Sequence, residues 1–376
     1  MSTSAAAKFV GSSSEIAHYY GFRPLLEVVP EAKSRTPTLA ETAAAITAQL
    51  SVSETDPILS FYAAPVRVHN NPLAARDSSE FALQIFGAKG PMSEIHILKT
   101  LEAILVENGN KIVRLRVNSM GDRDSRQRFM RELSNFLRRR AAEIEPVLSP
   151  SQRVRVLENP LAIYEVGDEA LVQMLTEGPR PVHYLSEKSR LHFRQVLELL
   201  EQVGFPYEID DCLVGDHQES RVIFRVELGE EDSVVIECGG GRYDDYLQYA
   251  IGKNTACVHA NIVFNSKTGA LPPSSRRRKA TPGVYLVQFG DSAKLSGFTV
   301  LESLRRAHIP VSQQFDARHL APQLSYAQQI GVPYVLIMGA REAIDQTVIV
   351  RAVATSAQTT VSIRELPRHL RSLKLV

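Results

Sequence analysis

The chain has 376 residues, enough for two or three domains with sizeable hydrophobic cores. Hydrophobic residues make up 44% and charged residues 23%, which excludes disordered, collagen-like and coiled-coil proteins. With 43 Lys and Arg against 42 Asp and Glu, a uniformly basic nucleic-acid-binding surface is excluded too. Three cysteines are too few for a disulfide framework, and no apolar run reaches the length of a membrane span. The sequence therefore predicts a reduced, cytoplasmic protein without membrane partners.

Charge is distributed unevenly along the chain. Residues 268–376 carry a net charge of +8, whereas residues 1–267 carry −7. Four of the positive charges are consecutive: Arg276, Arg277, Arg278 and Lys279. Because phosphate groups respond to local potential rather than to total charge, this region could contact RNA. The alternative is a solvated basic linker.

Composition divides the chain into two predicted domains. The Pro- and Ser-rich segment 268–282 predicts a linker between residues 1–267 and 283–376. In the first part, helical periodicity alternates with strand patterns. The predicted helices cover 93–107, 123–145 and 186–203, and the predicted strands cover 111–117, 207–210, 221–227 and 233–238. The last two strands form a predicted antiparallel hairpin, which favours an α+β domain built on an antiparallel sheet.

Residues 283–376 show a more regular alternation of strands and helices. The predicted strands cover 284–289, 310–315, 333–338, 347–353 and 359–363. Helical patterns cover 295–304, 319–330 and 366–375. This order predicts a compact α/β domain with a mostly parallel sheet.

The most unusual string is Gly239-Gly240-Gly241, placed between a predicted strand and a predicted helix. Glycines at such a junction permit positive φ angles and bring a ligand close to backbone amides. Arg242 and Asp244 would supply a charged donor and acceptor beside it. The alternative is a tight strand-to-helix turn without a ligand. The string matches neither the P-loop nor the dinucleotide-binding fingerprint.

Other candidate clusters are weaker. Cys257 and His259 alternate on a predicted strand, but no third or fourth ligand has fitting spacing, so we expect no metal site. Asp216, His217 and Glu219 could form an acid–base cluster, although neighbouring polar residues on a loop are more often simply solvated.

The string Cys238–Asp244 resembles the Gly-Gly-Arg-Tyr-Asp signature of histidyl-tRNA synthetases, which are class II aminoacyl-tRNA synthetases. Similar segments follow the family's order: Tyr20–Pro24, Arg116–Gly121, Asn159–Leu161 and Tyr184–Phe193. The resemblance implies an α+β class II synthetase-like catalytic domain, with an antiparallel sheet flanked by helices. A smaller α/β anticodon-binding-like domain would follow it. The implied ligand pocket comprises Glu80, Gly239, Gly240, Gly241, Arg242, Tyr243 and Asp244.

The sequence departs from the family at three positions that carry its chemistry. Ser79 stands where the second class motif has its phosphate-binding arginine, and Asn265 replaces the final arginine of the third. Gly215 falls where the histidine-binding strand has its catalytic arginine. Glycine cannot replace a fixed cationic donor. Nearby, Glu219 and Ser220 replace two tyrosines, while Ile262 replaces a glycine that leaves space for the nucleotide and Phe264 replaces a glutamate. We therefore assign no catalytic residue and interpret the chain as a degenerate paralogue.

The favoured hypothesis is a dimeric synthetase-like pseudo-enzyme that binds tRNA through its phosphates or acts as a regulatory protein. The candidate RNA-binding residues are Arg276, Arg277, Arg278, Lys279, Arg318 and Arg341. One alternative is an active, divergent histidine–tRNA ligase, which would require ATP and Mg; otherwise we expect no cofactor. The other is a regulatory subunit of ATP phosphoribosyltransferase with a histidine-biosynthesis enzyme as partner. It ranks third because such subunits usually lack the anticodon-like domain.

Overall fold

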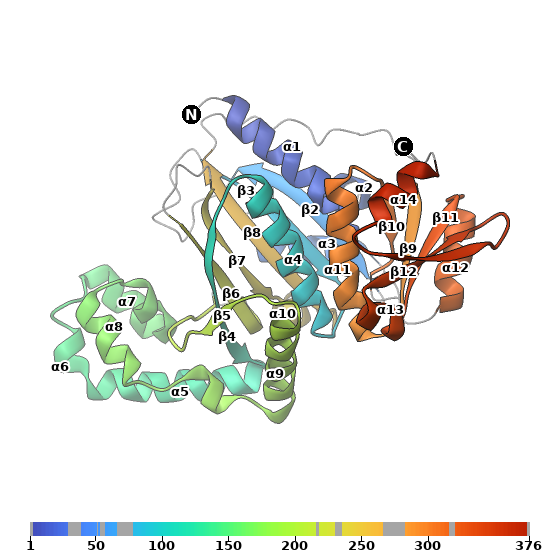
Figure 1. Ribbon diagram of the computed structural model, residues 1–376. Helices are drawn as coiled ribbons and strands as arrows, with labels where there is room; N and C mark the ends of the chain where they lie inside the picture. Colours follow the sequence, from blue (N-terminus) through green and yellow to red (C-terminus); the bar gives the residue numbers. More distant parts are fainter. Residues whose placement is uncertain are drawn as a thin grey trace.

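The computed structural model describes residues 3–28, 39–50, 52, 57–65, 78–215, 218–229, 235–265, 283–315 and 320–373. These residues form two sheets with helices around them (Figure 1). In the described part of the chain, no helix is long and apolar enough to cross a membrane.

The larger sheet has eight strands in the order β1-β2-β3-β8-β7-β6-β4-β5. All neighbours from β2 to β4 pair antiparallel, and only the edge strands β1 and β5 pair parallel. The strands are β1 (Arg23–Pro24), β2 (Ile58–Pro65), β3 (Ser78–Phe86), β4 (Ile112–Gly121), β5 (Tyr207–Ile209), β6 (Ser220–Leu228), β7 (Val235–Arg242) and β8 (Cys257–Asn265). The predicted antiparallel sheet and the hairpin of β6 with β7 are therefore confirmed.

Helices cover both faces of this sheet. They are α1 (Thr3–Tyr19), α2 (Leu25–Val28), α3 (Leu39–Gln49), α4 (Met92–Glu107), α9 (Glu187–Gln202) and α10 (Asp244–Ile251). On one face, α1, α4 and α9 pack onto alternate strand residues, while α3 and α10 pack on the other face. The predicted helices at 93–107 and 186–203 correspond to α4 and α9.

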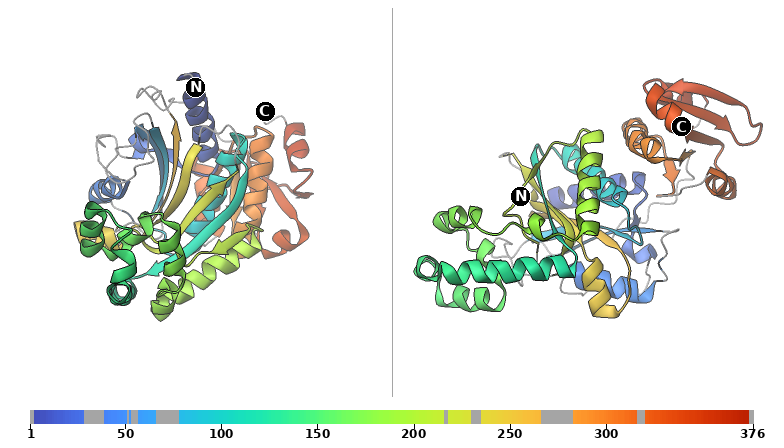
Figure 2. Two further views of the ribbon diagram at one scale, coloured as in Figure 1. Left: turned by 90° about the vertical axis from the view of Figure 1, so that its left-hand side faces the viewer. Right: turned by 90° about the horizontal axis from the view of Figure 1, so that it is seen from below.

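A separate lobe lies between β4 and β5 in the chain (Figure 2). Its elements are α5 (Arg123–Arg139), α6 (Ala141–Ile144), α7 (Pro150–Glu158), η1 (Pro160–Glu165), α8 (Glu169–Thr176) and η2 (Pro181–Tyr184). The N-cap of α5 is Asp122, whose carboxylate accepts a hydrogen bond from the Ser125 amide at 3.0 Å. The lobe has its own cluster of buried residues, including Phe129, Leu133 and Leu175.

The smaller sheet has five strands in the order β10-β9-β11-β12-β13. The elements are β9 (Val284–Gln288), α11 (Asp291–Arg306), β10 (Val311–Gln313), α12 (Leu320–Gln329), β11 (Tyr334–Met338), α13 (Ala340–Asp345), β12 (Thr347–Ala352), β13 (Gln358–Ser362) and α14 (Leu366–Ser372). Only β9 with β10 and β9 with β11 pair parallel. The predicted mostly parallel sheet is therefore wrong: β11, β12 and β13 follow one another through short connections, which permit only antiparallel pairing.

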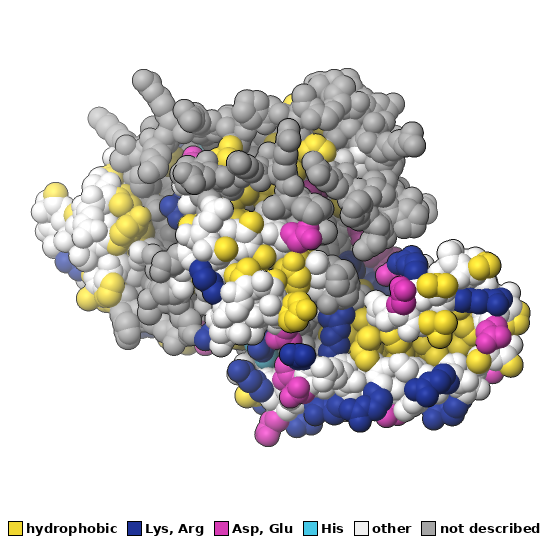
Figure 3. Space-filling view, turned by 180° about the vertical axis from the view of Figure 1, so that it is seen from behind, with side chains coloured by type: hydrophobic (Ala, Val, Ile, Leu, Met, Phe, Trp, Pro, Cys, Tyr) yellow, Lys and Arg dark blue, Asp and Glu magenta, His cyan; other side chains and the backbone are white. Residues whose placement is uncertain are grey.

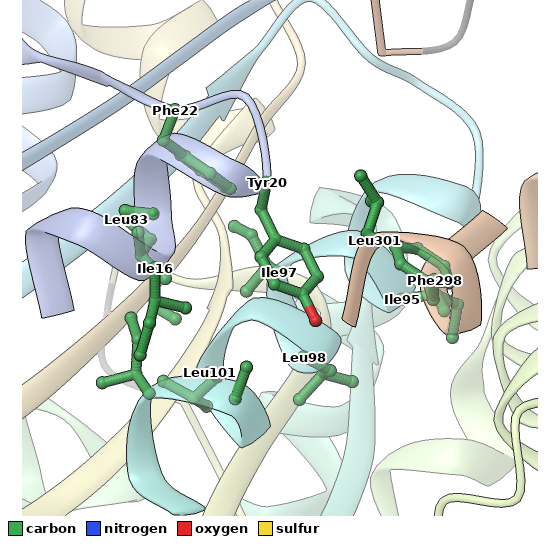
Figure 4. Packing of buried hydrophobic residues seen from close by; sticks show 14 of the residues in the cluster. Ile16, Tyr20, Phe22, Leu83, Ile95, Ile97, Leu98, Leu101, Phe298 and Leu301 are labelled. Carbon is green, nitrogen blue, oxygen red and sulfur yellow. The ribbon is translucent and has the colours of Figure 1, made fainter. Parts of the chain in front are cut away.

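The two sheets share one hydrophobic cluster. Phe298 and Leu301 on α11 pack beside Tyr20, Ile95 and Leu98 of the larger domain (Figure 4). Phe298 is 6% exposed, and its ring centroid lies 6.4 Å from that of Tyr20. The predicted linker 268–282 lies outside the described residues, and the domain boundaries at 267 and 283 stay a prediction. The shared cluster implies that the two domains stabilise each other.

We expect Phe298→Ala to lower the free energy of unfolding by about 3–5 kcal/mol, because it leaves a cavity in the shared cluster. Urea unfolding followed by circular dichroism should show one transition for the whole chain. The matched control is Phe289→Ala. Because Phe289 is 37% exposed, this variant should lose much less unfolding free energy. Two separate transitions in the wild-type protein would contradict the shared core.

Candidate functional site

The middle of the larger sheet has one apolar and one polar face. Alternate residues of β8, from Val258 to Phe264, belong to the hydrophobic cluster under α1 and α4. The residues between them, His259 and Asn261, point to the opposite face because successive side chains of a strand alternate. We call this opposite side of β3, β8, β7 and β6 the polar face.

Strand register places the members of the polar face side by side. Gln84, His259 and Gly241 form one row across β3, β8 and β7. The next row contains Asn261, Gly239 and Arg225 across β8, β7 and β6. Gly239 and Gly241 therefore lie at the centre of this face, between charged and amide side chains, whereas Gly240 pairs with Ala260 and faces the apolar side.

The three glycines are strand residues. They lie within β7, and none of them has a positive φ angle. A Cβ atom on Gly240 would overlap the backbone oxygen of His259, and one on Gly239 would lie 2.9 Å from the Phe224 oxygen. The expected strand-to-helix turn with positive φ angles is therefore wrong. Glycine is required here because neighbouring backbones and side chains come too close for a Cβ atom.

Glu219 and its partners occupy the centre of the polar face. The Glu219 side chain is buried, with Oε2 3.1 Å from Nη2 of Arg225 and Oε1 3.2 Å from Nε2 of His259. Burial alone would raise the pKa of Glu219, but Arg225 and His259 outweigh it and hold this pKa well below its usual range. The ring of Tyr243 stacks on His259, with centroids 3.9 Å apart.

Arg242 and Asp244 belong to a different network, in which Arg242 is fully buried and Asp244 is partly buried. Arg242 Nη1 lies 2.8 Å from Glu94 Oε1, and Nη2 donates to the Ala88 oxygen at 2.8 Å. Its Nε lies 3.2 Å from Asp244 Oδ2. Burial would raise the pKa of Glu94, but Arg242 and His192 lower it to about 2. The structure thus places Arg242 and Asp244 in ion pairs that join α4, β7 and α10, where we expected a donor and an acceptor for a ligand.

Glu80 lies on β3, which β8 separates from the glycine strand β7. Tyr62 Oη donates a hydrogen bond to its Oε1 at 3.3 Å. Burial raises the pKa of Glu80 to about 7, and the hydrogen bond from Tyr62 offsets only part of this effect. Glu80 therefore changes protonation near neutral pH.

Two of the positions that depart from the family, Ser79 and Asn265, lie at the same end of the neighbouring strands β3 and β8, on opposite faces of the sheet. Ser79 is buried and pairs with Phe264 between β3 and β8, while Asn265 is exposed at the end of β8. A Cβ atom on Gly215 would lie 2.8 Å from the Glu219 Cβ. Ile262 packs in the cluster under α1 and α4, so the expectation that it fills space on the ligand side is wrong.

Of the remaining predicted site residues, the structure describes only Arg341. Arg276–Lys279, Arg318, Asp216 and His217 fall outside the described residues. Arg341 on α13 is exposed, with Nε 3.6 Å from Asp345 Oδ2. Among the described residues, no group of three or more His, Cys, Asp or Glu side chains could hold a metal ion.

Two features were not predicted from the sequence. Arg225 was overlooked, although a charged residue within the apolar strand run from Val222 to Val226 indicates a polar sheet face. The second feature is a basic face of α5 with five exposed arginines: Arg123, Arg128, Arg131, Arg138 and Arg139. Lys and Arg side chains gather along the lower edge of the lobe in Figure 3.

A cavity of about 690 Å³ lies away from the polar face, between α4, α9 and α11. Tyr20, Lys99, Glu302 and Arg305 are among the residues that line it. Its charges are paired with one another: Lys99 with Glu102, and Glu302 with Arg305 at 2.7 Å.

Comparisons with known proteins match both domains. Residues 284–373 match the family model described as "Anticodon binding domain". A histidine–tRNA ligase of Gloeothece citriformis is 27% identical over 84% of this chain and 73% of its own length. The histidine–tRNA ligase of Thermosynechococcus vestitus is 28% identical over 81% of this chain and 71% of its own length. The structure of apo S. aureus histidyl-tRNA synthetase covers 98% of this chain and 96% of its own at 18% identity, with a TM-score of 0.49.

An antiparallel sheet flanked by helices, followed by an anticodon-binding domain, defines a class II aminoacyl-tRNA synthetase-like protein. Within that class, the relatives that match over most of this chain are named histidine–tRNA ligase, at 27–28% identity.

We expect Gly240→Ala to destabilise the fold by about 3 kcal/mol or more, because its Cβ would overlap the backbone of β8. The measurement is urea unfolding. Gly90→Ala serves as the matched control, since a Cβ atom there meets nothing within 4 Å. Equal stability of the two variants would contradict the close approach of β7 and β8.

We expect Glu80→Gln to stabilise the protein at alkaline pH by about 2 kcal/mol. The pKa of Glu80 in the folded protein, about 7, exceeds the ordinary value of 4.5. The stability that protonated Glu80 contributes is therefore complete below about pH 4.5 and is lost as the pH rises through 7. Urea unfolding at about pH 5 and about pH 8.5 measures the difference in unfolding free energy between Glu80→Gln and the wild-type protein. This difference should grow with pH. Glu237→Gln, the same change at an exposed glutamate of β7, is the matched control.

Proposed function

We propose that this chain is a synthetase-like, RNA-binding protein that does not activate histidine. The observation that carries the proposal is the centre of the polar face, where Glu219 holds Arg225 and His259 beside Gly215. A substrate carboxylate or phosphate needs a positive group that is free to contact it. Here the nearest guanidinium is already engaged by a carboxylate of the chain itself.

The geometry around Arg225 supports this proposal. Its Nη1 donates to the backbone oxygens of Phe224 at 2.8 Å and Gly240 at 3.2 Å, while Nη2 faces Glu219. These contacts direct the guanidinium towards the backbones of β6 and β7. With Ser79, Gly215 and Asn265 at the positions of the family's arginines, we infer that charge on the α-phosphate of ATP would go unstabilised.

The match of residues 284–373 to an anticodon-binding domain supports RNA as the partner. The net charge of +8 over residues 268–376 favours contact with phosphate groups. The basic face of α5 offers a second positive surface on an otherwise acidic part of the chain. A homodimer and a cytoplasmic location remain part of the proposal.

An active ligase is the second candidate, favoured by the names of the relatives at 27–28% identity. Histidine-dependent ATP–pyrophosphate exchange separates the two. Because loss of one fixed cationic donor costs about 10²–10³ in rate, we expect no exchange above background from the purified full-length chain. Exchange at an ordinary synthetase rate would establish the ligase.

We expect tRNA binding by the full-length chain to weaken steeply with salt, with a log–log slope of about −0.7 to −0.9 for each phosphate neutralised. Reversing Arg276, Arg277 and Arg278 to glutamate should weaken binding of all tRNAs alike and flatten this slope, because such contacts do not read bases. Filter binding at several salt concentrations measures both.

The matched control for this reversal changes Lys188, Arg190 and Arg194 to glutamate, which alters net charge equally at exposed positions of α9. If both triple variants lose affinity equally, the effect is one of net charge, and the assignment to residues 276–278 fails.

A further inference from the structure

The polar face contains a site already filled by a side chain of the protein. Glu219 is 2% exposed, and its two carboxylate oxygens face different partners. Oε2 lies 3.1 Å from Arg225 Nη2 on β6, and Oε1 lies 3.2 Å from His259 Nε2 on β8. A guanidinium that donates to the carboxylate and an imidazole nitrogen 3.2 Å from it thus approach the same group from different strands.

The space that this carboxylate occupies is kept open by glycines. A Cβ atom on Gly241 would lie 3.0 Å from Glu219 Oε1, and one on Gly215 would lie 2.9 Å from Oε2. A Cβ atom on Gly239 would lie 3.0 Å from Nε of Arg225. Side chains at these three positions would displace either the carboxylate or the guanidinium that holds it.

The backbone near Glu219 is held in an uncommon conformation. Arg221 has a φ angle of 56°, and the pairing of β6 with β7 is irregular between Ser220 and Phe224. Arg221 Nε lies 3.1 Å from Asp244 Oδ2, and Arg126 donates to the Glu219 backbone oxygen at 2.8 Å. Positive φ angles are unfavourable for residues other than glycine, so these contacts keep Glu219 in place against local strain.

We propose that Arg225, His259 and the surrounding glycines form a carboxylate-binding site which Glu219 fills as an internal ligand. A guanidinium and an imidazole N–H suit the two oxygens of a planar carboxylate. The inference deepens the proposed function at the same site, because a filled site excludes a substrate carboxylate. Its test measures binding without ATP or tRNA, so the two proposals can fail separately.

The test replaces the internal ligand with a free one. Glu219→Ala removes a CH₂–COO⁻ group, and acetate has the size and charge of the missing piece. Purified full-length wild-type protein, Glu219→Ala and Glu237→Ala are melted in sodium chloride, acetate or phosphate at equal ionic strength. Glu237 is the control because it is an exposed glutamate on the adjacent strand.

We expect acetate, compared with chloride, to raise the Tm of Glu219→Ala by about 2–4 °C and to leave the other two proteins unchanged. Adding Arg225→Met to Glu219→Ala should abolish the rise. If Glu219→Ala does not fold in chloride, we expect refolding in acetate to recover native circular dichroism.

Three outcomes would overturn the proposal. Acetate could stabilise all three proteins equally, which is a general salt effect. It could fail both to stabilise Glu219→Ala and to recover its folding. Phosphate could match acetate, in which case the site binds anions without preference for carboxylate.

Discussion

The close approach of β7 to its two neighbouring strands is the constraint on which the candidate site depends. Without side chains at Gly239, Gly240 and Gly241, the backbone of β7 lies against the His259 oxygen and the Phe224 ring. On the polar face, Gly239 and Gly241 leave a strip of β7 without side chains. Arg225 and Glu219 extend into this strip from the β6 side, while His259 faces it from β8.

A buried guanidinium fixes the end of the same strand. Arg242, the last residue of β7, is fully buried and paired with Glu94 and Asp244. A charge in this position is tolerated only when its hydrogen bonds are satisfied, and removal of one partner would leave the others uncompensated. The Arg-Tyr-Asp sequence, which resembles the signature of histidyl-tRNA synthetases, therefore anchors the glycine strand to α4 and α10. Its presence does not imply that the neighbouring face retains chemistry.

The domains of this protein are joined by apolar packing as well as by the chain. Phe298 of α11 contacts the rings of Tyr20 and His96 in the larger domain. Burial lowers the pKa of His96 to about 4, so this histidine is neutral in its aromatic surroundings near pH 7. An isolated C-terminal fragment would expose this face of α11, which is why the binding experiments use the whole chain.

Sequence periodicity was sufficient for α4, α9, the β6–β7 hairpin and nearly every element after residue 283, because each buries one face in a regular pattern. It was insufficient for β3, whose residues are buried on both faces and include Ser79, Glu80 and Gln84. Burial on both faces removes the alternation of apolar and polar residues by which a strand is predicted. The polar residues in β3 also interrupt the continuous apolar run that would indicate a buried strand. The order of motifs likewise indicated the resemblance to histidyl-tRNA synthetases and predicted the absence of three of their arginines.

Only the tertiary structure decided what the individual residues do. It showed that the three glycines are required by contact between strands, and that Arg242 is an internal anchor. It also brought Glu219, Arg225 and His259 together, although 40 positions separate the first from the last. Strand register determines which residues become neighbours across a sheet, and no local pattern in the sequence specifies that register.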